Sequence, residues 1–134
     1  MVVYKTSNNM TLEKNYNKWL SIQPLSEADQ NKLSKRFTVE YNYNSNHLEG
    51  NTLTYDQTEL LLLFGKVSGE GHLKDFNDMK ASEVSVKMMK EEAANKKDPL
   101  TQNFIRTFHH TLLREDYIES RTLPNGVQAI CVLI

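Results

Sequence analysis

One long helical pattern, from Ser26 to Gly50, constrains the fold of this chain more than any other feature. Ser26 followed by Asp29 is typical of a helix N-terminus, because a serine hydroxyl caps free N–H groups and a carboxylate favours the first turn. Gly50 is suited to end such a helix. We predict one helix over about 26–49, whose apolar stripe is of the kind that faces a core. The stripe comprises Leu33, Phe37, Tyr41, Asn44 and Leu48.

The remaining patterns predict further helices. Residues 1–25 form an N-terminal extension with a short amphipathic helix, and residues 26–134 form the main domain. A capping-box pattern at Thr54 and Gln57 opens a helix over about 54–64. Further helices are expected over about 75–95 and 101–113, the last one capped by Thr101. The amphipathic positions of the first helix are Leu12, Tyr16, Trp19 and Leu20.

Two of these helices carry apolar groups that indicate burial. The apolar run from Leu60 to Phe64 indicates a helix that is buried on most sides. The helix over 101–113 is expected to pack through one face, and His109 is expected to face the core while His110 is exposed. The residues of that buried face are Ile105, Phe108, Leu112 and Leu113.

The C-terminal segment has a different character. Pro124, Asn125 and Gly126 indicate a turn, and the β-branched residues from Val127 to Ile134 indicate a strand. We therefore expect 122–134 to be the first strand of a β-hairpin, with an apolar edge that has no partner. The sequence predicts a mainly α fold, a helical bundle that is incomplete and interrupted at this strand.

Composition indicates the cellular compartment of the protein and the partners that it does not attract. The net charge of −1 gives no field that would attract nucleic acid or an anionic membrane. The single cysteine, Cys131, cannot form an internal disulfide, and no apolar run approaches the length of a membrane span. We expect a cytoplasmic protein without a membrane anchor.

The end of the long helix carries the residues most informative about function. Glu49 lies where the helix dipole disfavours a carboxylate by a few tenths to about 1 kcal/mol. A surface charge at a frayed helix end is the alternative reading. The segment Ser45-x-x-x-Glu49-Gly50 resembles the [ST]-x-x-x-E-[GN] inhibition motif of Fic-type (Fido) AMP-transferases. Two later segments arrive in the order typical of that family: Ile105-x-x-Phe108-His109-x-x-Leu112-Leu113 and the turn Pro124-Asn125-Gly126 before the flap.

The resemblance implies a Fic/Fido-like fold and a regulatory role for Ser45, Glu49 and Gly50. In the family, the inhibitory glutamate pairs with the second arginine of the catalytic loop H-x-F-x-[DE]-G-N-G-R-x-x-R. That arginine would otherwise hold the γ-phosphate of ATP, so the glutamate prevents productive ATP binding. Ser45 would help to place the helix. The complete family domain uses ATP and Mg²⁺ to transfer AMP to hydroxyl groups of a target protein.

This sequence departs from the family pattern in one respect. None of its four histidines is followed by Gly-Asn-Gly-Arg, so it contains no catalytic loop. We therefore expect no catalytic, cofactor-binding or metal-binding residue in this chain, and no AMP transfer by the chain alone. It reads as the N-terminal portion of a Fic-family enzyme.

Two alternatives remain open. The chain could act as an antitoxin-like regulator that supplies an inhibitory helix in trans to a Fic protein, or as a plain helical interaction module. A homo-oligomer is also compatible with the sequence. The loop Gly65–Gly71 lacks the order of a phosphate loop, and adjacent His109 and His110 point about 100° apart on a helix and cannot chelate one metal ion together.

Overall fold

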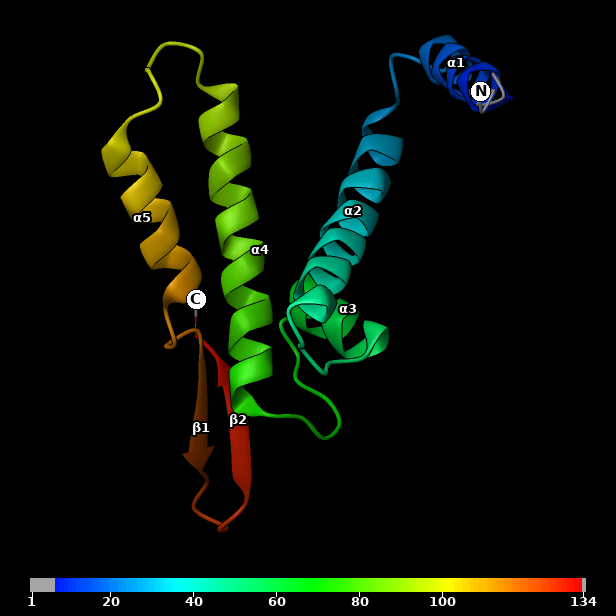
Figure 1. The fold of residues 1–134 in the computed structure, drawn as a ribbon. Helices are drawn as coiled ribbons and strands as arrows, with labels where there is room; N and C mark the ends of the chain where they lie inside the picture. The colour runs from blue at the N-terminus through cyan, green and yellow to red at the C-terminus, as the bar shows by residue number, and fades with distance from the viewer. Residues whose placement is uncertain (1–6, 134) are drawn as a thin grey trace, which may run out of the picture. The chain divides into compact units, whose positions relative to one another are not determined.

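The computed structural model describes residues 7–133, with side chains from Thr11 onward. The fold is mainly helical and ends in a β-hairpin (Figure 1), which confirms the predicted fold class. Its elements are α1 (Ser7–Ser21), α2 (Glu27–Leu48), α3 (Tyr55–Phe64), α4 (Leu73–Ala94), α5 (Gln102–Leu113), β1 (Ile118–Thr122) and β2 (Gln128–Val132).

The chain divides into two compact units, and the division falls between Ser34 and Lys35, within α2. The predicted domain boundary at residues 25 and 26 stays a prediction. In the first unit, Ser26 caps α2 as expected: its hydroxyl oxygen accepts a hydrogen bond from Asp29 N at 3.1 Å and donates to the Asp29 carboxylate at 2.7 Å. The amphipathic positions of α1 are solvent-exposed.

The apolar stripe predicted for α2 is wrong in phase. Phe37, Tyr41 and Leu48 are exposed, whereas the buried side chains of α2 are Val39 and Asn42. Phe37 and Tyr41 stack on each other with ring centroids 5.4 Å apart, and the Lys90 ammonium lies 4.7 Å from the centroid of the Phe37 ring. These two contacts stabilise the rings at the surface. A polar residue, Asn42, takes the buried position instead.

The hydrophobic core lies between α3, α4 and the beginning of β1. α3 begins with the predicted capping box at Thr54 and Gln57. It buries Leu61 completely, but Phe64 is 63% exposed, so the prediction that the whole apolar run is buried on most sides is wrong. α3 packs mainly on α4, and its first residue, Tyr55, meets Tyr43 of α2 edge-on with ring centroids 5.5 Å apart. In the described part of the chain, the remaining side of α3 has no neighbour of this kind. The core residues are Leu53, Leu61, Phe76, Met79, Ala81, Tyr117 and Ile118.

α5 runs beside α4 (Figure 1) and begins at Thr101, whose hydroxyl accepts from Phe104 N as predicted. Its predicted buried face is only partly covered. Phe108 is half-buried, but Ile105, Leu112 and Leu113 are exposed. The reason is that α5 contacts α4 and no other described element closely, so part of its apolar face has no neighbour among residues 7–133.

The two strands form an antiparallel hairpin in which Ile118 lies opposite Val132. β2 confirms a strand within 122–134, but it is the second strand of the hairpin and not the first, because β1 precedes it. Ile134 lies outside the described residues. β1 pairs with β2 along one edge, and the other edge of β2 has no strand partner among the described residues. β1 was missed because its residues after Ile118 are polar and lack an apolar alternation. Within the described part of the chain, no helix has the length and apolar character needed to cross a membrane.

Candidate functional site

The C-terminus of α2 is closed by a glycine cap that fixes the position of Glu49. Gly50 has φ of +90°, a left-handed conformation that side-chain-bearing residues rarely adopt. Gly50 N donates to His47 O at 3.1 Å, and Asn51 N donates to Asn46 O at 3.0 Å. This pair of bonds is the Schellman motif, in which Gly50 follows the C-cap residue of the helix. Glu49 is therefore the C-cap residue of α2. The predicted cap at Gly50 is confirmed.

Ser45 and Glu49 line a common cavity of about 560 Å³. The end of α2 forms one wall of the cavity and α4 forms a second wall. The end of α5 contributes the apolar side chains of the lining. The structure thus brings together two of the three predicted regulatory residues, while Gly50 shapes the turn and does not line the cavity. The lining residues are Ser45, Asn46, Glu49, Lys74, Asp78, Ser82, Leu112 and Leu113.

The charged groups of this cavity differ in their partners. Lys74 forms an ion pair with Asp78 one turn later on α4, and this hydrogen bond raises the pKa of Lys74. The exposed carboxylate of Glu49 has no hydrogen bond or ion pair with any residue that the structure describes. The cavity therefore contains two carboxylates and one ammonium group, and one carboxylate is free. A cationic group fits this arrangement better than a phosphate does.

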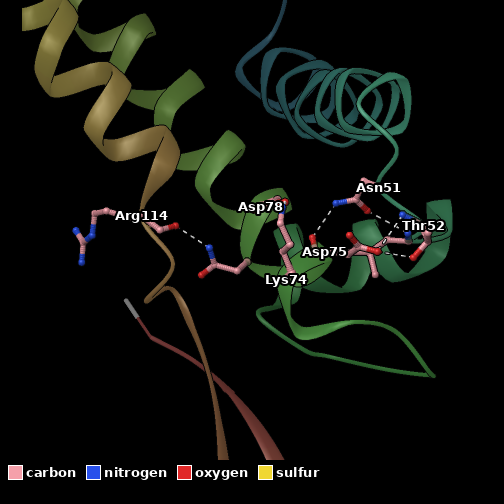
Figure 2. A network of polar contacts seen from close by, with 8 residues as sticks. Asn51, Thr52, Lys74, Asp75, Asp78 and Arg114 are labelled. Atoms are coloured by element: carbon pink, nitrogen blue, oxygen red, sulfur yellow. Dashed lines mark hydrogen bonds and ion pairs between the residues drawn. The ribbon is translucent and has the colours of Figure 1, made fainter.

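A polar network beside the cavity attaches the residues after Glu49 to α4 (Figure 2). Asn51 is 7% exposed, and its amide donates to the backbone oxygen of Asp75 at 2.8 Å and accepts from Leu53 N at 3.0 Å. Thr52 donates to the carboxylate of Asp75 through its backbone N–H, at 3.1 Å, and through its hydroxyl. The segment that follows Glu49 is therefore fixed to the first turn of α4.

A second buried asparagine connects α4 to the segment before the hairpin. Asn77 donates to Arg114 O at 2.7 Å and accepts from Tyr117 N at 2.9 Å. Sequence reasoning missed Asn42, Asn51 and Asn77. Asparagine in a helix interior is a signal that could have found two of them, because it is a poor helix former and its burial requires hydrogen-bond partners.

The histidines do not contribute to this cavity. His109 and His110 are both exposed, so the prediction that His109 faces the core is wrong. α5 packs against α4 through neighbouring positions instead. Among the described residues, no group of three or more His, Cys, Asp or Glu side chains could hold a metal ion. The loop from Gly65 to Gly71 connects α3 to α4, as predicted.

Comparisons with known proteins give the family. No protein-family model matches the chain, and no curated protein matches it. A solved structure does: a Fic domain-containing signaling protein from Bacteroides thetaiotaomicron VPI-5482, with 44% sequence identity and a TM-score of 0.69. The match covers 87% of this chain and 47% of that protein, so the chain spans about half the length of its relative. Identity and fold together place this chain in the Fic-domain family.

Proposed function

We propose that this chain is the regulatory portion of a Fic-family AMP-transferase and that Glu49 restrains the transfer reaction. One observation carries the proposal: the Glu49 carboxylate is free among the described residues and lines a cavity together with Ser45. A free carboxylate of this kind is a partner for an arginine side chain, which binds carboxylates through two parallel hydrogen bonds.

The resemblance to the Fic family indicates which arginine this would be. In Fic proteins, the inhibitory glutamate pairs with the second arginine of the catalytic loop, which otherwise holds the γ-phosphate of ATP. A Glu49–arginine pair would remove that phosphate contact and prevent the α-phosphate from lying in line with the target hydroxyl. In this proposal Glu49 acts by occupying a group that the nucleotide requires, and it takes no part in the chemical step.

The cavity of this chain does not itself fit ATP with Mg²⁺. Its charged groups are two carboxylates and a lysine that is already paired with Asp78, and a triphosphate would be repelled by this set. The sequence also contains no H-x-F-x-x-G-N-G-R loop. ATP and Mg²⁺ therefore belong to the proposal for the complete protein, in which the catalytic loop would provide the phosphate-binding groups.

The complete enzyme would act in the cytoplasm on a protein target. AMP transfer to a protein hydroxyl requires a protein substrate, and a single half-buried cysteine is compatible with a reducing cytoplasm. An inhibitory helix supplied in trans to a separate Fic protein is the alternative. The two differ in where the catalytic loop is encoded, so the nucleotide sequence downstream of the Ile134 codon distinguishes them.

The test is AMP transfer by a protein that contains this chain together with the catalytic loop. Glu49→Gly is expected to raise self-modification by about ten- to a hundredfold, the size of a lost charge-assisted hydrogen bond. Glu91→Gly, which removes an exposed carboxylate from the last turns of α4, is the matched control and should leave the rate unchanged. Equal rates for Glu49→Gly and the native protein would contradict the proposal.

A further inference from the structure

Polar contacts attach the end of α2 to α4 on both sides of Glu49. Before Glu49, the hydroxyl of Ser82 on α4 donates to the side-chain oxygen of Asn42 at 2.7 Å. After Glu49, the Asp75 residue of α4 accepts from Asn51 and Thr52. Neither set of contacts involves Glu49 itself. Both can therefore hold the backbone around Glu49 while its carboxylate stays available to a partner.

The Asn42 contact fixes the direction in which the inhibitory residues face. Three residues along a helix correspond to a rotation of about 300°, and seven to about 700°, so Ser45 and Glu49 lie within about 60° and 20° of the direction of Asn42. Asn42 is fully buried, and its amide nitrogen donates to Thr38 O at 2.8 Å. Both ends of the Asn42 amide are thus held, and Ser82 lines the same cavity as Ser45.

Apolar packing gives α2 little other support in this unit. Val39 is the only apolar side chain that α2 buries, whereas α4 buries Phe76, Met79 and Ala81. Where the apolar contact area is small, hydrogen bonds decide how firmly a helix end is held. Beside an edge-on contact of Tyr43 with Tyr55 of α3 at 5.5 Å, the placement of the Glu49 turn therefore depends largely on polar contacts.

We propose that Asn42, through Ser82, and Asp75, through Asn51 and Thr52, are positioning residues that hold the Glu49 turn against α4 from its two sides. Loosening either contact set increases the motion of the turn and weakens the restraint that Glu49 exerts. The second statement rests on the proposed function, whereas the first concerns this chain alone and is tested without any activity.

The experiment is hydrogen–deuterium exchange on the 134-residue chain, read at the backbone N–H groups of Gly50 and Asn51. These groups bond within α2 and touch neither Asn42 nor Ser82. Ser82→Ala is expected to raise their exchange rates about tenfold, which corresponds to about 1.4 kcal/mol. Ser82→Thr keeps the hydroxyl and should restore slow exchange. Asn44→Ala is the matched control, because Asn44 is exposed and bonds only to Glu40 O in its own helix.

A second variant tests the other side of the turn. Asp75→Ala removes the carboxylate that accepts from Thr52 and should raise exchange at the amides of Asn46 and His47, which Asp75 does not contact. In both variants, exchange in the core of α4, at Phe76 and Met79, serves as the measure of general destabilisation. The proposal is overturned if the turn exchanges no faster than in Asn44→Ala, or if its increase does not exceed that of the α4 core.

Activity separates this proposal from the function on which its second part rests. In a protein that includes the catalytic loop, Ser82→Ala should release part of the AMP transfer that Glu49→Gly releases in full. If Glu49→Gly releases nothing while exchange at the turn rises as expected, the inhibitory function is wrong and the positioning stands. If Glu49→Gly releases activity and the exchange rates do not change, the positioning proposal is wrong.

Discussion

The core between α3, α4 and β1 and the end of α2 are held together in different ways. Phe76 and Leu61 are fully buried among other apolar side chains. The segment from Asn42 to Thr52, which carries Glu49, is attached to α4 mainly through amide, hydroxyl and carboxylate groups. Apolar burial gives a stable but unspecific attachment, whereas hydrogen bonds give direction with less stability. The end of α2 is therefore expected to open more readily than the apolar core.

The largest expected effect lies in the core. Phe76→Ala should lower the free energy of unfolding by about 3–5 kcal/mol, because it removes a fully buried ring and leaves a cavity. Phe64→Ala is the matched control, since Phe64 is 63% exposed and should cost far less. Urea unfolding followed by circular dichroism measures both. Similar losses for the two variants would contradict the placement of the core.

The second largest loss of stability is expected at Asn77, whose buried amide bonds to the segment before the hairpin. Asn77→Ala leaves Arg114 O and Tyr117 N without their partner, and an orphaned buried group costs about 1–3 kcal/mol. Asn103→Ala, at an exposed position of α5, should change the unfolding free energy little. A loss for Asn77→Ala no greater than for Asn103→Ala would show that the amide does not join these segments.

A smaller effect is expected at the cap of α2. Gly50→Ala should cost about 1–2 kcal/mol, because alanine is disfavoured at a φ of +90° although the space around its Cβ is open. Gly50→Asn should cost less, since asparagine tolerates left-handed conformations better. Thermal unfolding of the native chain and the two variants gives their order of stability. Equal stability of Gly50→Ala and the native chain would contradict the Schellman cap.

The smallest effect concerns a surface ion pair near the core. The Arg114 guanidinium donates two hydrogen bonds of 2.8 Å to Asp116, and this contact lowers the pKa of the Asp116 carboxyl below its ordinary value. A carboxyl with a lowered pKa in the folded state adds stability above its unfolded pKa, and that contribution disappears as the pH falls through the folded pKa. Arg114→Ala should raise the pKa of Asp116 in an NMR titration. An unchanged titration would show that the pair does not form.

Local signals in the sequence predicted much of the fold. The caps at Ser26, Thr54 and Thr101 were found because capping depends on residues three positions apart. The buried phase of α2 and the strand β1 were not found, because each depends on contacts with segments distant in the sequence. Ser45 and Glu49 were named from a family motif, while Asn42, Asn51 and Asp75 support them through contacts that no local pattern encodes.

The measurement that tests the account most directly is AMP transfer by Glu49→Gln in a protein that contains this chain and the catalytic loop. Glutamine keeps nearly the shape of glutamate and removes its charge. If the restraint is a carboxylate–arginine pair, Glu49→Gln should release self-modification almost as fully as Glu49→Gly. If Glu49→Gln remains as restrained as the native protein, the side chain blocks the site by its volume, and the proposed ion pair is wrong.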